Sequence, residues 1–494
     1  MSLISVNNLT FGYDGSLKNI FENVSFNIDT DWKLGLIGRN GKGKTTFLKL
    51  LLGKYEYQGA ISKNVEFDYF PFEVKNKERM AIEIVNEIAP NVEDWEIIRE
   101  LNLLNTDTEV LYRSFNLLSG GEQIKILLIS LFLKGNNFLL IDEPTNHLDI
   151  ETRNNLVNYL EKKKGFILVS HDRNFLDKVV NHIISINNTN IEIQQGNFSF
   201  WKENKNRQDN FEKIQNERLQ KDINRLEIAS KNCAKWSNEA EKTKNKKYNS
   251  ETTIDKGYIG HKADKMMKKS KVMEQRIEKA INEKTNLLKN IEVNDTLKII
   301  PLKSNKNPLI FAHNLQIKYS KETIFNPITF EVNNGDRAAL IGKNGIGKSS
   351  ILKLILGEEL QYNGEFMVAN DLKISYVSQS TEDLKGNLRT FAYDNKINES
   401  IFKAMLVKMG LSQFDFDTNI QDMSEGQKKK VLIAKSISEQ ANIYIWDEPL
   451  NYIDILTREQ IEDAILNYNP TIIFVEHDEK FIEKVATKII NLVK

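Results

Sequence analysis

The sequence predicts an α/β fold that occurs twice in one chain, with a long antiparallel helical hairpin between the two copies. Four short motifs recur about 305 residues apart, a distance that indicates a duplicated domain rather than a solenoid. Fully apolar runs such as LGLIG and FLLID precede the polar motifs, as in strands buried on both faces of a parallel sheet. Between the copies the sequence has a helical period instead.

The repeated motifs keep the same order in both halves of the chain. GRNGKGKTT at 38–46 corresponds to GKNGIGKSS at 342–350, and LSGGEQ at 118–123 corresponds to MSEGQK at 423–428. FLLIDEPTNHLD at 138–149 corresponds to IYIWDEPLNYID at 443–454, and FILVSHD at 166–172 corresponds to IIFVEHD at 472–478. We therefore expect each copy to carry the same kind of site.

The middle of the chain is expected to form the hairpin. We expect the first copy to span 1–197, the linker 198–304 and the second copy 305–494. Apolar residues recur at steps of three and four in two segments, which predicts a packing seam on two paired helices. The seam includes Leu219, Ile223, Leu226, Met273 and Ile277. Glycines and an Asn-Ser pair interrupt the pattern and place the tip near 243–262.

The composition describes a globular protein with no membrane domain of its own. Of its 494 residues, 40% are hydrophobic and 28% are charged. The N-terminal residues lack the pattern of a signal peptide, and no apolar run approaches the roughly 20 residues that span a bilayer. The single cysteine, Cys233, fits a reducing compartment. We therefore expect a cytoplasmic protein.

Charge is balanced overall but not locally. The chain has 68 basic and 68 acidic residues, while Trp201–Ile300 has 24 Lys and Arg against 16 Asp and Glu. Lysines there can neutralise phosphates, and tyrosines can stack on unpaired RNA bases. The candidate rRNA-binding residues near the tip are Lys242, Lys244, Lys246, Lys247, Tyr248, Lys256 and Tyr258. The alternative is a solvated hairpin that has no partner.

The glycine-rich motifs predict two phosphate-binding loops. In G-x-x-x-x-G-K-[ST], backbone amides converge on phosphates and the lysine neutralises their charge. Lys44 and Lys348 are expected at the β- and γ-phosphates of ATP, with Thr45 and Ser349 on Mg²⁺. The other loop residues expected around the nucleotide are Gly38, Asn40, Gly41, Gly43 and Thr46, and in the second copy Gly342, Asn344, Gly345, Gly347 and Ser350.

The acidic pairs that end the FLLID and IYIWD runs predict the metal and catalytic positions. Asp142 and Asp447 are expected to hold Mg²⁺, as an aspartate at the end of a buried strand does in ATPases of this type. Glu143 and Glu448 are then placed to orient and deprotonate the attacking water. A solvated strand end is the alternative for such a pair outside this setting.

With LSGGEQ, the DEPTNHLD run and the strand-end histidine present together, the sequence resembles the ABC ATPases. The resemblance implies that the two copies pair head to tail within a monomer, each signature completing the other copy's site. Ser119, Gly120 and Gly121 would cap the nucleotide at Lys348, and Ser424 and Gly426 the nucleotide at Lys44. It also implies γ-phosphate contacts by His171 and His477, a Mg²⁺ contact by Gln379, and adenine stacking by Tyr13 and Tyr319. For the two tyrosines, core packing is an equal alternative.

Two departures from the family pattern predict unequal sites. The second signature reads SEGQ, so Glu425 adds a carboxylate, and Phe72 stands where the second copy has Gln379. Both changes affect the site built on Lys44. We expect the Lys348 site to turn over faster.

Two fused ABC domains with a charged helical linker resemble the ABC-F group, and FDYFPFEV, MSEGQKKK and WDEPLNYID are similar to the Lsa/Vga type. This resemblance implies binding to the bacterial ribosome, at 23S rRNA and near the exit-site tRNA. It further implies protection from lincosamides, streptogramin A and pleuromutilins by ATP-gated insertion of the linker. A housekeeping translation factor of the same group remains open. From another class, the ATP-binding subunit of a transporter with a separate membrane polypeptide also remains open.

Overall fold

The computed structural model describes residues 3–13, 19–135, 137–146, 148–187, 190–244, 265, 268, 271–273, 275–280, 296–319 and 322–493. The chain divides into two compact units, one made of Met1–Trp201 and Asn294–Lys494, the other of Lys202–Val293. The duplicated α/β fold is confirmed, because each copy in the first unit contains an antiparallel sheet, a larger and mainly parallel sheet, and flanking helices. The expected boundaries at 197/198 and 304/305 remain a prediction.

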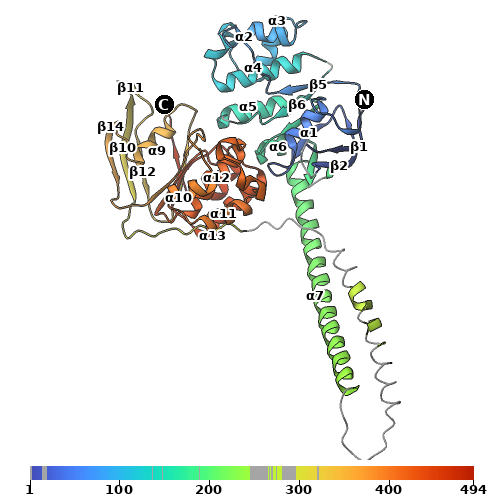
Figure 1. Cartoon of the computed structure of the whole chain (residues 1–494). Helices are drawn as coiled ribbons and strands as arrows, with labels where there is room; N and C mark the ends of the chain where they lie inside the picture. The colour runs from blue at the N-terminus through green and yellow to red at the C-terminus, as the bar shows by residue number, and fades with distance from the viewer. Residues whose placement is uncertain are drawn as a thin grey trace, which may run out of the picture. The chain divides into compact units, whose positions relative to one another are not determined.

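Each copy combines an antiparallel sheet with a larger, mainly parallel one (Figure 1). In the first copy the strand orders are β2-β1-β4 and β5-β6-β7-β3-β8-β9. Among the described strands of the larger sheet, only β9 pairs antiparallel with its neighbour. The strands are β1 (Leu3–Phe11), β2 (Phe21–Asp29), β3 (Lys33–Ile37), β4 (Gln58–Ser62), β5 (Glu66–Phe70), β6 (Asn137–Asp142), β7 (Phe166–Val169), β8 (His182–Asn187) and β9 (Asn190–Gln195).

The apolar runs of the sequence are the central parallel strands. Every residue of β7 is buried, and in β6 the four residues between Asn137 and Asp142 are buried. Such strands bury both faces because helices or a second sheet cover each side. The helices of the first copy are α1 (Lys44–Leu51), α2 (Ala81–Ile88), α3 (Asp94–Leu103), α4 (Gly120–Leu133), α5 (Ile150–Leu160) and α6 (Arg173–Val179), with 3-10 turns η1 (Thr108–Tyr112) and η2 (Phe115–Leu117).

The second copy repeats this arrangement. Its parallel sheet has the order β15-β16-β17-β13-β18, and its antiparallel sheet joins β10 to β11, β12 and β14. The strands are β10 (Ile310–Tyr319), β11 (Glu322–Thr323), β12 (Ile328–Val332), β13 (Arg337–Ile341), β14 (Gln361–Val368), β15 (Ile374–Val377), β16 (Ile443–Asp447), β17 (Ile472–Val475) and β18 (Lys488–Asn491). The helices are α9 (Lys348–Ile355), α10 (Leu388–Asp394), α11 (Glu399–Lys408), α12 (Glu425–Ser438), α13 (Ile455–Tyr468) and α14 (Glu479–Val485), with 3-10 turns η3 (Gln413–Asp417) and η4 (Ile420–Asp422).

The second unit contains most of the long helix α7 (Phe198–Lys244), which has 47 residues. Ile223 on α7 and Ile277 on the second helical segment are 4% and 8% exposed, in agreement with the expected seam. Met273, expected in the same seam, is 55% exposed, so that part of the prediction is wrong. Methionine is unbranched and adaptable, which makes its pattern a weaker signal than that of isoleucine.

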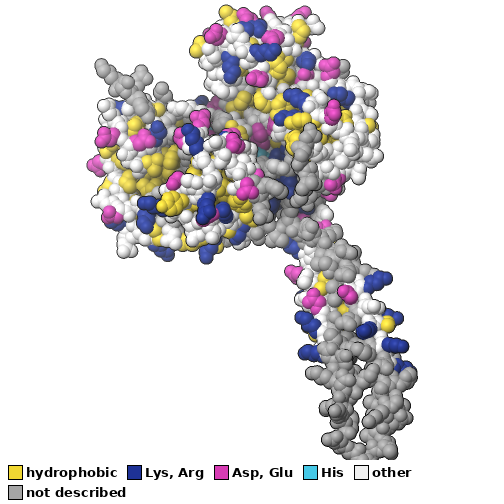
Figure 2. Space-filling view, in the orientation of Figure 1, with side chains coloured by type: hydrophobic (Ala, Val, Ile, Leu, Met, Phe, Trp, Pro, Cys, Tyr) yellow, Lys and Arg dark blue, Asp and Glu magenta, His cyan; other side chains and the backbone are white. Residues whose placement is uncertain are grey.

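Charges of both signs lie along the described part of α7 (Figure 2). Several of them pair within the helix at i and i+4, as Lys205 with Asp209 at 3.3 Å and Arg207 with Glu203 at 3.5 Å. None of the helices in the part of the chain that the structure describes has the length and apolar character needed to cross a bilayer.

Candidate functional site

The phosphate-binding loops connect an interior strand of each parallel sheet to the helix that follows it, β3 to α1 and β13 to α9. Gly43 and Gly347 cap these helices with φ of 92° and 97°, a backbone conformation that favours glycine. A Cβ on Gly43 would lie 2.5 Å from Ile20 Cγ2. The glycine is therefore required by backbone conformation and by space.

The loop lysines point inward. Lys44 Nζ donates to the Gly38 carbonyl at 2.7 Å and to Asn40 Oδ1 at 3.1 Å. Lys348 Nζ donates to the Gly342 carbonyl, also at 2.7 Å. Burial lowers the pKa of both lysines. Each ammonium group thus lies within the curl of its loop, where the motif requires a cation.

The residues predicted to hold Mg²⁺ lie side by side at the end of β6 and of β16. Thr45 Oγ1 donates to Asp142 Oδ2 at 3.2 Å, and Ser349 hydrogen-bonds the Asp447 carboxylate. Burial raises the pKa of both aspartates. Asp447 Oδ1 is buried and makes no hydrogen bond with the residues that the structure describes. A hydroxyl beside such a carboxylate suits the oxygen ligands that Mg²⁺ prefers.

The Glu143 carboxylate accepts a hydrogen bond from the His171 backbone but has few side-chain partners among the described residues. Its Oε1 makes no hydrogen bond with the described residues, and His171 Nε2 lies 3.4 Å from it. Burial, followed by the neighbouring Asp142, raises the pKa of Glu143 to about 8. Burial also holds the pKa of His171 well below its usual range.

Glu448, at the equivalent position of the second copy, is held from two sides. Its Oε2 accepts from Gln379 Nε2 at 3.0 Å and from Asn451 Nδ2 at 2.7 Å, while His477 Nε2 lies 3.6 Å from Oε1. In the first copy Phe72 replaces the glutamine and is 41% exposed. The predicted inequality of the two sites therefore has a structural counterpart in how the glutamates are held.

The two copies meet at the Lys44 loop. Asn40 Nδ2 donates to the Tyr452 carbonyl at 2.7 Å, and a Cβ on Gly426 would lie 2.6 Å from Asn40 Nδ2. The signature residue Gly426 thus lies against the opposite phosphate loop, as the head-to-tail resemblance implies. Ser424 caps its own helix α12 by accepting from the Gln427 amide.

The Lys348 loop meets the first copy through different residues. The Asp149 carboxylate accepts from the Asn344 backbone, and Lys343 Nζ lies 2.7 Å from Glu151 Oε2. A Cβ on Gly120 would have no heavy atom within 4 Å. A Cβ on Gly121 would lie 3.4 Å from Thr152 Cγ2 of its own copy, and Ser119 caps α4. At the Lys348 site the contact between the copies is therefore made by Asp149 and Glu151, which follow the acidic pair. The space beside Gly120 of the signature is open.

Several predicted residues lie apart from these contacts or outside the described part. Tyr13 is 44% exposed, and its hydroxyl lies 2.8 Å from Thr46 Oγ1, at the edge of the Lys44 site. Tyr319 ends β10, but its side chain lies outside the described residues. The same holds for the side chains of the candidate rRNA-binding residues, Lys242, Lys244, Lys246, Lys247, Tyr248, Lys256 and Tyr258.

Sequence reasoning missed three polar neighbours of the sites. Tyr69 donates to Asp142 Oδ2 at 2.9 Å, and Asn451 donates to Glu448. Lys430 donates to Asp454 Oδ2 at 2.7 Å and is 2% exposed. A tyrosine at the end of β5 and an asparagine three residues after the glutamate were visible signals, whereas the partner of Lys430 depends on tertiary packing.

The sequence family described as "ABC transporter" matches residues 21–146 and 325–451, which together are more than half of the chain. The chain belongs to the ABC family. Each of its two ABC domains is of the ATP-binding type, whose members hydrolyse ATP. The matches include both phosphate loops and both acidic pairs.

Three similarities extend over nearly the whole ABC chain. It is 30% identical to the ATP-binding protein Uup of Buchnera aphidicola over 99% of its own length and 80% of that protein. It is 28% identical to the ribosome protection protein VmlR of Bacillus subtilis, over 96% of its length and 84% of that protein. A solved structure of the archaeal ribosome recycling factor aABCE1 with the stalk protein aP1 has a TM-score of 0.61 at 19% identity, covering 98% of this chain and 87% of that one. The last similarity concerns the fold.

Proposed function

We propose that the protein is an ABC-F ATPase that acts on the bacterial ribosome in the cytoplasm. Glu143 and Glu448 orient the attacking water, and His171 and His477 contact the γ-phosphate. Mg²⁺, held by Thr45 and Asp142 in one site and by Ser349, Gln379 and Asp447 in the other, supplies positive charge to the β- and γ-phosphates when bound. The carboxylates at the strand ends, buried in Asp447 and Glu448, and the inward-pointing lysines support these assignments.

We propose further that the protein protects the ribosome from lincosamides, streptogramin A and pleuromutilins. ATP binding would close the two copies and present the hairpin to 23S rRNA and tRNA near the exit site. The observation that carries this proposal is the similarity to VmlR over 96% of the chain. The second candidate is a housekeeping ABC-F factor, because the relative of slightly higher identity, Uup, is named as an ATP-binding protein and not as a ribosome protection protein.

Co-sedimentation tests whether the protein binds ribosomes in an ATP-dependent way. The Glu143→Gln, Glu448→Gln protein should pellet with ribosomes in ATP and remain in the supernatant without nucleotide. Replacing Lys242, Lys244, Lys246 and Lys247 with glutamine should weaken this binding and reduce its salt dependence, because fewer counterions are released. Unchanged binding across the salt series would contradict the electrostatic role of the tip. Equal pelleting with and without ATP would contradict the gating.

Drug susceptibility separates the two candidate functions. Expression should raise the inhibitory concentrations of the three drug classes but leave an antibiotic that acts on the cell wall unaffected. Deleting 249–260 should abolish protection while ATP hydrolysis survives, because the sites lie in the other unit. If expression changes no inhibitory concentration but removing the gene slows translation, the housekeeping function is correct instead.

A further inference from the structure

A buried arginine of the first copy joins the loops that carry the two histidines. Arg153 on α5 is 9% exposed. Its Nη1 donates to Asp172 Oδ2 at 3.2 Å and to the His477 carbonyl at 3.1 Å, and its Nε donates to the Leu148 carbonyl at 2.9 Å. Asp172 directly follows His171, so one guanidinium group contacts both histidine loops.

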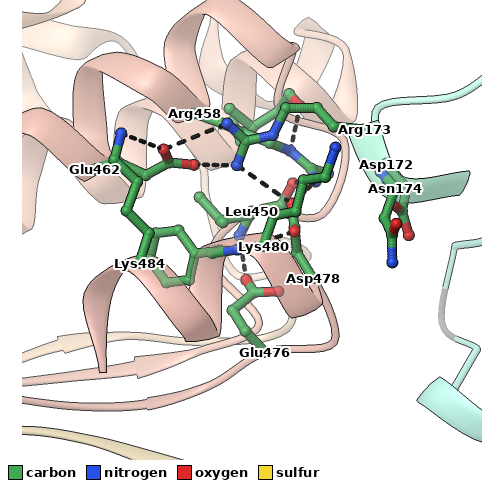
Figure 3. Close-up of polar contacts among 12 residues, drawn as sticks. Asp172, Arg173, Asn174, Leu450, Arg458, Glu462, Glu476, Asp478, Lys480 and Lys484 are labelled. Carbon is green, nitrogen blue, oxygen red and sulfur yellow. Dashed lines mark hydrogen bonds and ion pairs between the residues drawn. The ribbon is translucent and has the colours of Figure 1, made fainter. Parts of the chain in front are cut away.

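A second arginine crosses between the copies beside it. Arg173, the first residue of α6, binds the Glu462 carboxylate of α13 through both terminal nitrogens (Figure 3). Glu462 is fully buried and also accepts from Lys484 Nζ at 3.0 Å. Arg173 Nη2 lies 3.9 Å from Asp478 Oδ2, and Asp478 directly follows His477. The two histidine loops are thus linked twice by charged side chains.

The same cluster extends back to the Lys44 site. Asp478 Oδ2 accepts from Arg458 Nη1 at 3.1 Å, and Arg458 Nη2 donates to the Leu450 carbonyl at 2.8 Å (Figure 3). Two residues beyond Leu450, the Tyr452 carbonyl accepts from Asn40 in the Lys44 loop. Hydrogen bonds, together with the short backbone segments 450–452 and 477–478, therefore connect the Lys44 phosphate loop to the histidine of the other site.

These contacts are not a consequence of the internal repeat. Arg458 occupies the position of Arg153 in the second copy, but its side-chain hydrogen bonds to Ile453, Asp478 and Leu450 stay within its own copy. Glu479 stands at the position of Arg173, and the counterpart of Glu462 is the apolar Val157. The cross-copy hydrogen bonds of these arginines thus come from the first copy, while the charge of Arg458 also acts on Glu143 and His171 of the first copy.

We propose that Arg153, assisted by Arg173, is a positioning residue that couples the two ATP sites. When the His171 loop changes with the nucleotide at Lys44, Arg153 moves the His477 backbone and so changes turnover at Lys348. Separating the buried Arg173–Glu462 pair, which lies across the two copies, would leave uncompensated charges, so the joined loops move together rather than separately. The proposal rests on the proposed ATP hydrolysis at both sites.

Two variants of the Lys44 site measure the coupling. Lys44→Ala prevents ATP from being held there, whereas Glu143→Gln holds it without hydrolysis, and in both only the Lys348 site turns over. The ratio of their phosphate-release rates is the coupling factor. We expect at least a fivefold ratio in the otherwise unchanged protein, the lower end of typical coupling between sites. In an Arg153→Met background we expect a ratio near one.

Lys163→Met is the matched control, because Lys163 also pairs with a buried carboxylate, Glu100, but within the first copy. It should reduce thermal stability and leave the coupling factor unchanged. If Arg153→Met does not fold, Arg153→Lys and Arg173→Met take its place. Each of these variants lacks one of the two guanidinium groups that bond to the second copy.

A ratio near one in the unchanged protein, or a fivefold ratio that survives loss of Arg153, overturns the proposal. If the proposed ATP hydrolysis itself is wrong, a different experiment shows it. In that case the Glu143→Gln, Glu448→Gln protein would hydrolyse ATP at the parental rate, whatever the coupling factor.

Discussion

The Lys44 site and the Lys348 site contain the same loop, aspartate, glutamate and histidine, yet their glutamates have different neighbours. Glu448 accepts from two side-chain amides, whereas Glu143 Oε1 has no hydrogen-bond partner among the described residues. The Lys44 loop in turn has the closer contact with the opposite signature, through Asn40 and Gly426.

This difference separates two requirements of an ATP site. A water-activating carboxylate must be held in place, and the opposite copy must close over the nucleotide. In this chain the carboxylate is held by more side chains at the Lys348 site. The opposite copy already lies closer to the phosphate loop at the Lys44 site. The comparison suggests a site that hydrolyses and a site that mainly holds ATP.

The largest effect is expected when both glutamates are removed. Glu143→Gln with Glu448→Gln should lower phosphate release by about 100-fold or more, the usual contribution of a general base. Glutamine keeps the shape, so binding of a fluorescent ATP analogue should be retained. Of the single variants, Glu448→Gln should lose more activity. Equal losses would remove the functional inequality of the sites.

The next effect concerns closure. Gly426→Ala should lower turnover roughly tenfold or more, because a Cβ there meets Asn40 Nδ2 at 2.6 Å and the Tyr452 carbonyl at 2.7 Å. Gly121→Ala is the matched variant, since its Cβ would meet Thr152 at 3.4 Å, an ordinary contact. Steady-state ATPase assays compare the two. A larger loss from Gly121→Ala would mean that, during turnover, the first signature packs more closely on the Lys348 loop than the second signature does on the Lys44 loop.

A smaller effect is expected from the amide that holds Glu448. Gln379→Phe should slow the Lys348 site by roughly tenfold, which is the value of one hydrogen bond to a charged group. It copies the first copy's own residue, Phe72, so the side chain is one that this fold accommodates. The measurement is phosphate release in a Glu143→Gln background, where only the Lys348 site is active. An unchanged rate would assign the positioning of Glu448 to Asn451 alone.

The duplicated fold followed from the sequence because its signals are local. Apolar strand runs and glycine spacing depend on neighbours in the chain, and the predicted Lys44, Thr45 and Asp142 do lie together. The cross-copy residues could not be predicted in this way. Arg153 is an ordinary helix residue in sequence, and its partner His477 is 324 residues away.

The linker shows the limit of periodicity. Its three-four spacing predicts the burial of Ile223 and Ile277, but the same pattern fails at Met273. Spacing tells which residues share a face of a helix, and it does not tell how far the partner helix covers that face.

The smallest effect is expected at Glu425, which the sequence placed as an extra carboxylate near the Lys44 nucleotide. In the structure Glu425 hydrogen-bonds Thr381 and lies 3.0 Å from Lys428 Nζ, both in its own copy. These partners lower the pKa of Glu425 against the opposing effect of burial, so its charge is already compensated locally.

Glu425→Gly, which restores the usual signature, should therefore change turnover of the Lys44 site by no more than about twofold, since an exposed ion pair contributes little. The assay is phosphate release in a Glu448→Gln background, where the Lys44 site alone is active. Glu425→Gln serves as the control, because it removes the charge but keeps the side chain and the helix propensity that glycine lowers. A large acceleration in both variants would show that the carboxylate repels the nucleotide, and the inequality of the sites would then come from the signature rather than from Phe72.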